Sequence, residues 1–240
     1  MTDDIQEEGY KQYDGLWGES LTQLKSRLVY QRKSEMICLY CGLKADTREH
    51  CPPKSFLKKP YPNNLKIIPA CSKCNNGYSK FENLFLQLIN EIESGNISDY
   101  LQSDISMMIE KHILPDYALI TIKKVAIGHA AYQLSEFFGD TVDDYIEISF
   151  VLRNEVSKNQ WEMLQKPQKT DVIPELGSRG SGEIIIIRDT TNQKSNHDSF
   201  AIADWIDVQT GIYKYLSFVD DEHIVVNMVF RDILFVKVVM

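Results

Sequence analysis

Five cysteines are the first residues in this chain of 240 whose types and spacing indicate chemistry. Cys38 and Cys41 form one C-x-x-C pair, and Cys71 and Cys74 form a second pair thirty residues further on. Four thiolates from two such pairs satisfy tetrahedral zinc, so we expect a structural Zn²⁺ ion there. All five cysteines lie within 37 consecutive residues, which disfavours a disulfide framework spread over the fold. Cys51 breaks the pair spacing; we interpret it as a small buried residue, with a metal or redox role as the alternative.

The polar residues between and just after these pairs could activate water for attack on a phosphodiester. Glu49 and His50 are adjacent, Asn64 follows His50 by fourteen residues, and Asn75 directly follows the second pair. Histidine, with an ordinary pKa near 6.5, can take a proton at neutral pH. Carboxylate and amide oxygens are hard ligands that suit Mg²⁺ or Mn²⁺. The set therefore combines a candidate base with candidate ligands for a catalytic metal.

The order C-x-x-C, E-H, N-L and C-x-x-C-N resembles the motif of the HNH (ββα-metal) endonuclease family. The resemblance covers roughly residues 36–85, about a fifth of the chain. It implies that His50 is the general base, that Asn64 braces the loop and orients His50, and that Glu49 and Asn75 bind a catalytic Mg²⁺ or Mn²⁺ ion. The activity it implies is hydrolysis of phosphodiester bonds in nucleic acid. DNA is favoured over RNA, because most HNH proteins cut DNA.

Two features depart from the pattern of that family. The interval from Asn64 to Asn75 is eleven residues, longer than in compact members. The final metal position holds an asparagine, so that the triad reads H-N-N, and a second asparagine, Asn76, follows it directly. Asn76 is therefore an alternative ligand. Glu82 lies seven residues beyond Asn75, two helical turns along on the same helix face, and could add a ligand or only cap the helix.

The charge of the chain is unevenly distributed. The net charge is −8, yet residues 24–80 carry twelve Lys and Arg against three acids, a local charge of +9. A basic segment in an acidic chain can attract phosphate, although lysine is also a common solubilising surface residue. The cations that flank the candidate site are the candidates for holding the nucleic-acid backbone: Arg48, Lys54, Lys58, Lys59, Lys73 and Lys80.

Hydrophobic periodicity predicts an α+β protein: a zinc-stapled ββα-metal module, then helices, then a mostly antiparallel, β-rich C-terminal domain. Apolar spacing indicates helices within residues 21–35, 74–94, 97–113 and 123–139, the last ended by Gly139. The helix after the second C-x-x-C begins either at Cys74 or at Ser79, where Glu82 would complete a capping box. Strand-like segments span residues 145–152, 182–189, 211–219, 223–230 and 232–240. They predict a sheet of about four to six strands, with 184–187 as a strand covered on both faces.

We divide the chain into a lead-in (residues 1–35), the HNH module (36–93) and an accessory or regulatory region (94–240). The accessory region is acidic, so we expect it to bind a protein partner or a second copy rather than nucleic acid. Bacterial conflict systems often pair a small HNH effector with a sensor, so a partner-activated antiviral effector is one hypothesis. The acidic start lacks a signal sequence and no apolar run reaches about 20 residues, which predicts a cytoplasmic protein without membrane contact. The alternative function is a non-catalytic zinc-binding adaptor for protein or nucleic acid.

Overall fold

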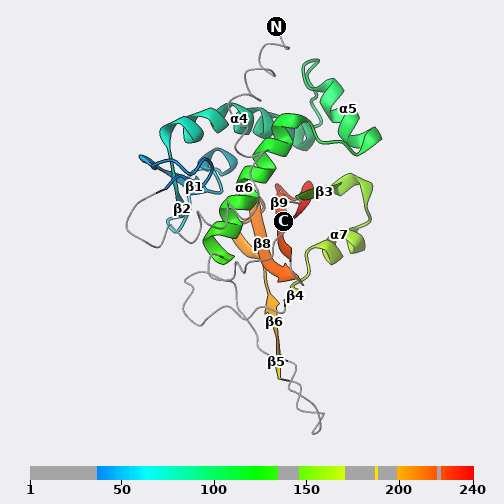
Figure 1. Cartoon of the computed structure of the whole chain (residues 1–240). Helices are drawn as coiled ribbons and strands as arrows, with labels where there is room; N and C mark the ends of the chain where they lie inside the picture. The colour runs from blue at the N-terminus through cyan, green and yellow to red at the C-terminus, as the bar shows by residue number, and fades with distance from the viewer. Residues whose placement is uncertain (1–36, 135–145, 171–186, 189–198, 221–222) are drawn as a thin grey trace.

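The computed structural model describes residues 37–134, 146–170, 187–188, 199–220 and 223–240 (Figure 1). Its first elements are two antiparallel strands, β1 (Thr47–Cys51) and β2 (Lys66–Ala70). In their register Glu49 faces Ile68, and His50 faces Ile67. The short 3-10 helix η1 (Lys54–Phe56) lies in the connection between these strands. The predicted helix of residues 21–35 lies outside the described residues.

Helix α4 (Ser72–Ser94) follows β2 at once, so the order of elements is strand, strand, helix. Cys71 is its N-cap, and the thiol of Cys71 accepts a hydrogen bond from the backbone N–H of Cys74. The alternative start at Ser79 is wrong, because the Ser79 hydroxyl donates to the carbonyl of Asn75 inside the helix. The helix ends at Gly95, which has φ of 72°, a left-handed conformation that glycine adopts without steric cost.

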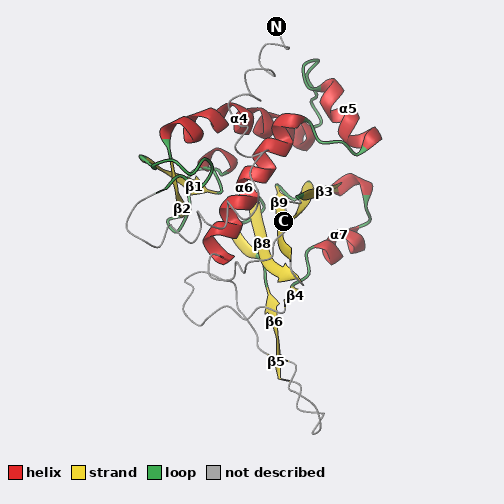
Figure 2. Cartoon of the chain, in the orientation of Figure 1, coloured by secondary structure: helices red, strands yellow, loops and turns green. Residues whose placement is uncertain are grey.

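Helices α5 (Gln102–Lys111) and α6 (Asp116–Leu134) follow. Helix α6 is buried on nearly all sides, because it contacts α4 and the β1–β2 hairpin as well as three strands of the C-terminal sheet. In Figures 1 and 2 it crosses the centre of the molecule between these layers. Gly139, the predicted end of this helix, lies outside the described residues. No helix among the described residues is long and apolar enough to cross a membrane.

The C-terminal region is an antiparallel sheet of five strands in the order β3-β10-β9-β8-β7, as the strand patterns predict. Four of its strands coincide with predicted segments: β3 (Glu147–Leu152), β8 (Tyr213–Asp220), β9 (His223–Phe230) and β10 (Leu234–Val239). Strand β7 (Ile206–Gln209) was not predicted. A smaller sheet of β4 (Gln168–Thr170), β6 (Ser199–Ala203) and β5 (Ile187–Arg188) lies beside it.

Both faces of the five-stranded sheet are covered, and β9 is the strand whose residues are buried on both faces. One face packs on α6, and the other on α7 (Lys158–Leu164), through Trp161, and on β6. Residues 184–186, most of the strand predicted to be doubly covered, lie outside the described residues. The main hydrophobic core contains residues of the hairpin, of α4 to α6 and of the sheet, so these elements share one interior.

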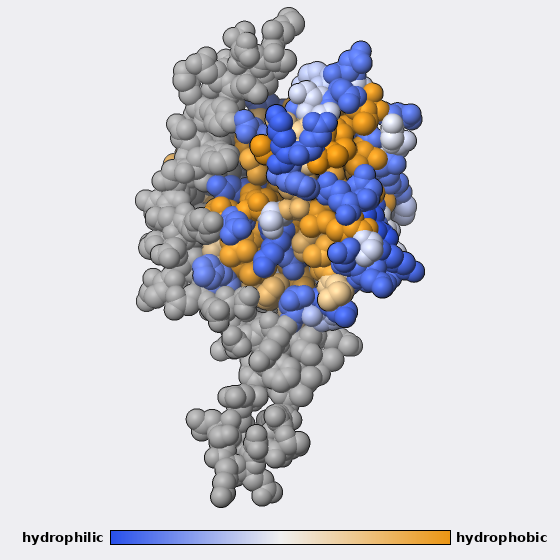
Figure 3. All heavy atoms as spheres, turned by 90° about the vertical axis from the view of Figure 1, so that its right-hand side faces the viewer, coloured by the Kyte–Doolittle hydropathy of each residue, from blue (hydrophilic) through white to orange (hydrophobic). Residues whose placement is uncertain are grey.

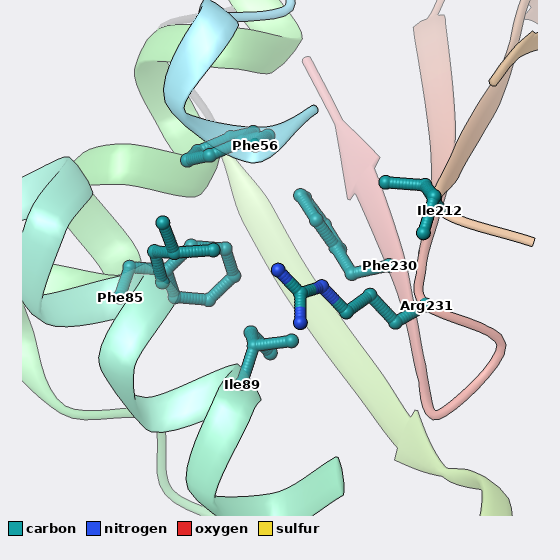
Figure 4. A pocket seen from close by; sticks show the side chains of 7 residues that line it. Phe56, Phe85, Ile89, Ile212, Phe230 and Arg231 are labelled. Carbon is teal, nitrogen blue, oxygen red and sulfur yellow. The ribbon is translucent and has the colours of Figure 1, made fainter. Parts of the chain in front are cut away.

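An apolar pocket of about 210 Å³ lies where α4 meets the sheet (Figure 4). Phe56, Phe85 and Phe230 line it, with ring centroids 5.0 to 5.7 Å apart. Arg231, in the turn between β9 and β10, reaches across its rim to Glu93 on α4 at 2.6 Å. The pocket offers aromatic packing and one cation that is already paired, so we assign it to the junction of α4 with the sheet.

The face that carries α5 and α7 shows hydrophobic patches among charged residues (Figure 3). Exposed apolar side chains near these helices include Ile109, Ile113 and Met163. Such patches on a surface are common at protein contacts, but single exposed apolar residues are ordinary. A partner for residues 94–240 therefore stays a prediction.

Candidate functional site

Four cysteines come together at one end of the β1–β2 hairpin. The sulfur atoms of Cys38, Cys41, Cys71 and Cys74 all lie within 4.8 Å of one another, and those of Cys41 and Cys71 are 3.6 Å apart. Tetrahedral zinc with Zn–S bonds of about 2.3 Å places its sulfur ligands about 3.8 Å apart. The four thiols are therefore arranged to hold a metal ion, in an arrangement compatible with structural zinc.

Local backbone structure presents the thiols. The first C-x-x-C turn closes through hydrogen bonds from Gly42 N to the Cys38 carbonyl at 3.0 Å and from Cys38 N to the Leu43 carbonyl at 2.7 Å. Gly42 has φ of 70°, which a side chain would disfavour. Leu39 N donates to the Pro69 carbonyl of β2, which joins this turn to the hairpin. The second pair is held by the start of α4, whose N–H of Ser72 donates to Asp46 at 2.6 Å.

The crowding of four thiols perturbs their protonation. A hydrogen bond from the Cys74 thiol lowers the pKa of Cys38 to about 4, while burial raises the pKa of Cys41 to about 11. Without a cation, the cluster therefore shares protons among sulfurs rather than holding four thiolates. A bound metal ion requires deprotonated thiols and would release those protons.

A second cluster of charges lies inside the module, on the other side of β1 from solvent. Lys124 of α6 forms ion pairs with both Glu49 of β1 and Glu82 of α4. Side-chain exposure is 1% for Lys124 and 6% for Glu49, so the cluster is enclosed. The Lys124 Nζ also lies 5.0 Å from the ring centre of Tyr78 and 5.7 Å from that of Tyr40. The three charges join three elements that are far apart in the sequence.

The cluster carries two carboxylates and only one ammonium. Burial raises the pKa of Glu49 to about 7; Lys124 opposes this rise and Glu82 adds to it. Burial pulls the pKa of Lys124 down, but the two carboxylates outweigh it and leave that pKa above its ordinary value. Lys124 is therefore an ammonium at neutral pH. The second carboxylate oxygen of Glu49, Oε2, is buried without a hydrogen-bond partner among the described residues.

His50 lies next to Glu49 but on the opposite side of β1, because successive side chains of a strand alternate between its faces. It is half-buried and faces Ile67 of β2, which is 46% exposed. Its Nδ1 atom is buried and has no hydrogen-bond partner among the described residues. Burial, with a contribution from Lys54, lowers the pKa of His50, so its imidazole is neutral at neutral pH. The structure thus gives His50 the protonation state of a base, although it does not bring His50 and Glu49 to the same side of the strand.

The asparagines are distributed around the hairpin. Asn75, in the first turn of α4, donates from Nδ2 to the Thr47 hydroxyl at 3.4 Å. Thr47 and Glu49 lie on the same face of β1, so Asn75 approaches the buried side of the hairpin. Asn64 is exposed before β2, and the described residues include no hydrogen bond from it to His50. Asn76 is exposed on α4.

The sequence patterns missed Lys124. A signal was present, because this lysine stands inside the apolar helical segment KKVAIGHAAYQL. A lysine in a helix that is buried on most sides requires a paired acid, since an isolated ammonium is costly to bury. Which acids it meets could not be read from spacing, because Glu49 and Glu82 are 75 and 42 residues away. The Ser55 hydroxyl, 3.5 Å from Glu82 Oε2, was also not singled out.

Cys51 does not belong to the four-cysteine cluster, and its interpretation as a small buried residue is confirmed. Its sulfur lies 3.5 Å from Nδ1 of His129, and Nε2 of His129 lies 2.7 Å from the Tyr213 hydroxyl. Burial lowers the pKa of His129 to about 3, so this histidine is neutral in the folded chain. A Cβ atom on Gly128 would lie 2.7 Å from the Cys51 sulfur. Small residues therefore let α6 approach β1 closely.

The surface of the module is positive. Its acids are withdrawn from solvent, because Glu49 is buried and Asp46 accepts two hydrogen bonds from Ser72. The exposed cations of this region form no salt bridge with another described residue: Lys44, Arg48, Lys54, Lys58, Lys59, Lys73 and Lys80. They remain available to an anionic ligand such as phosphate.

Compared with protein-family models, with curated proteins and with solved structures, the chain matches none. The assignment of a function therefore rests on the site itself.

Proposed function

We propose that this chain is a metal-dependent nuclease of the HNH kind, which hydrolyses phosphodiester bonds in nucleic acid. The observation that carries the proposal is His50: its neutral imidazole, with an unpartnered nitrogen, sits on a hairpin face among unpaired cations. The four-cysteine cluster, which we assign to structural Zn²⁺, would hold the hairpin to α4 without touching substrate.

The residues present also fit a hard catalytic cation. Glu49 and Glu82 converge on a single positive charge, and Glu49 Oε2 is a buried oxygen without a partner. Carboxylates of this type are the ligands that Mg²⁺ or Mn²⁺ prefers. We therefore propose Glu49 as a ligand, as the family resemblance implies, and Glu82 as the second carboxylate. Asn75, which bonds to Thr47, lies at the edge of this set.

The chain's own residues would divide the work as follows. His50 would accept a proton from the attacking water, because a neutral imidazole is a competent base at neutral pH. Arg48 and Lys54 would hold phosphates on either side of the scissile bond. A bound hard cation supplies charge stabilisation at the phosphate and the leaving oxygen. Asn64 is exposed near the same hairpin and could orient substrate or loop.

The substrate class follows from charge and family resemblance together. Exposed cations in a chain of net charge −8 favour an anionic polymer at this end of the molecule. DNA is our first choice of substrate and RNA the second. The accessory region would then supply regulation, and a partner-activated effector of a bacterial defence system is the setting that we propose.

The test compares the wild-type protein with His50→Ala on plasmid DNA and on structured RNA, with Mg²⁺ or Mn²⁺ added. His112→Ala is a matched control, because His112 is an exposed histidine of the accessory region. We expect wild type and His112→Ala to cut and His50→Ala to lose about 100-fold or more in rate, the usual scale of general base catalysis. Equal cutting by wild type and His50→Ala would exclude His50 as the base.

A second function is favoured by the burial of Glu49 beneath Lys124. If that ion pair is permanent, the module is a zinc-held adaptor that binds nucleic acid through its cations and does not cut it. Metal content separates the two functions. One zinc per chain without an exchangeable hard cation, together with binding of DNA in the absence of cleavage, would favour the adaptor.

A further inference from the structure

The interior of the module contains a cation that no metal supplies. The Lys124 ammonium stands between carboxylates from two different elements, Glu49 of β1 and Glu82 of α4. The rings of Tyr40 and Tyr78 lie beside the ammonium. Two carboxylates that converge from separate elements on one point form the arrangement used to bind a divalent cation.

The charge of the cluster is incomplete. Two carboxylates and one ammonium sum to −1, and the environment is nearly closed to water. A buried net charge is unfavourable unless it is compensated. A divalent cation in place of the ammonium would bring the sum to zero, and it would also give the unpartnered Oε2 of Glu49 a ligand to bind.

The cluster also differs from an ordinary structural ion pair in where it lies. Glu49 is the residue next to His50, and Glu82 is two turns along α4 from Asn75. The Ser55 hydroxyl reaches the outer oxygen of Glu82 from η1, the segment that also carries Lys54. The cluster is therefore directly behind the surface on which the proposed chemistry takes place.

We infer that Glu49 and Glu82 form a divalent-cation site for which the Lys124 ammonium is a built-in competitor. The inference rests on the proposed function for the identity of the site, and it adds a residue outside the family motif that controls metal loading. While Lys124 is paired, a metal ion must displace it before binding, so the apparent metal affinity is reduced. Withdrawal of Lys124, by a shift of α6 against the hairpin, would load the site.

The first experiment measures Mn²⁺ binding to the full-length, zinc-loaded protein by isothermal titration calorimetry or by electron paramagnetic resonance. Lys124→Met removes the ammonium and keeps much of the side-chain volume. We expect Lys124→Met to bind one Mn²⁺ ion at least tenfold more tightly than wild type. The gain should disappear in the double variant Lys124→Met with Glu82→Gln.

Lys123→Met is the matched control, because this neighbouring lysine on α6 forms no ion pair with Glu49 or Glu82. It should bind Mn²⁺ as wild type does. Equal Mn²⁺ affinity in wild type and folded Lys124→Met would overturn the inference. So would a gain in affinity that persists when Glu82 is replaced by Gln.

A second measurement needs no variant at Lys124. Competition is reciprocal, so saturating Mn²⁺ should expel the ammonium and expose it. We expect labelling of Lys124 by an amine-reactive reagent, followed by mass spectrometry, to rise severalfold with Mn²⁺ in wild type and to stay low in Glu49→Gln. Labelling of wild type that is unchanged at saturating Mn²⁺ would contradict the competition.

These outcomes are independent of cleavage. Mn²⁺ binding that depends on Lys124 in a protein that cuts no nucleic acid would retain the inference and reject the nuclease. Cleavage that depends on His50 in a protein whose Mn²⁺ affinity ignores Lys124 would do the reverse.

Discussion

The module holds two clusters of ionisable groups, and the two neutralise their charge in different ways. The four-cysteine cluster is made of two short turns and calls for an external cation, because four thiolates have no positive group beside them. The cluster of Glu49, Glu82 and Lys124 brings its own cation from α6. The first depends on local sequence and a metal supply, whereas the second depends on the packing of distant elements. Each can be broken separately, and the effects should differ in size.

The largest effect should come from the cysteines. Cys71→Ser, or removal of the metal with a strong chelator, should unfold the β1–β2 hairpin and the start of α4, because structural zinc contributes about 10 kcal/mol or more to small metal-held folds. Circular dichroism and zinc content measure the loss. Cys51→Ser is the control, since Cys51 lies outside the cluster and should retain the full metal content.

Breaking the internal ion cluster should have the next largest effect. Lys124→Ala leaves two buried carboxylates without a cation and should cost about 3–5 kcal/mol in the free energy of unfolding. Denaturant titration measures it. Mn²⁺ should recover part of the lost stability in this variant and little in wild type, because a ligand that binds only the folded state stabilises it. A loss below about 1 kcal/mol would show that the ion pairs are not formed in solution.

The close approach of α6 to β1 provides a smaller test. Gly128→Ala would place a Cβ atom 2.7 Å from the Cys51 sulfur and should destabilise the protein by up to about 3 kcal/mol, as overpacking of cores does. Cys51→Ala should reduce that cost when combined with Gly128→Ala. Additive losses in the double variant would mean that the two residues do not press on one another.

The smallest effect should appear on mild acidification. The pKa of His129 is about 3 in the folded chain and ordinarily near 6.5, so the unfolded chain takes up the proton first as the pH falls. The stability contributed by this neutral histidine is complete above about pH 6.5 and declines toward pH 3. Between about pH 6.5 and pH 5 the loss should be about 2 kcal/mol. His129→Asn should show a weaker pH dependence in urea titrations at the two pH values, and an identical slope would exclude His129 as its source.

Local patterns predicted much of the architecture. The two C-x-x-C pairs predicted the cysteine cluster, because each pair acts within one turn. The antiparallel C-terminal sheet followed from runs such as HIVVNMVF, whose β-branched and aromatic residues favour strands. The start of α4 was left open, since the Asp46 side chain that binds Ser72 comes from 26 residues earlier in the chain.

The sequence by itself determined which residues of this module can bind metal or take a proton: the paired cysteines, Glu49, His50, Asn75 and Glu82 follow from residue type and spacing. Only the tertiary structure decided which of them face one another. It placed Glu49 and His50 on opposite sides of β1, and it delivered Lys124 from α6 into the space between Glu49 and Glu82. The physical reason is burial. Once packing removes two carboxylates from water, they need a cation, and which cation is within reach depends on how helices distant in sequence pack together.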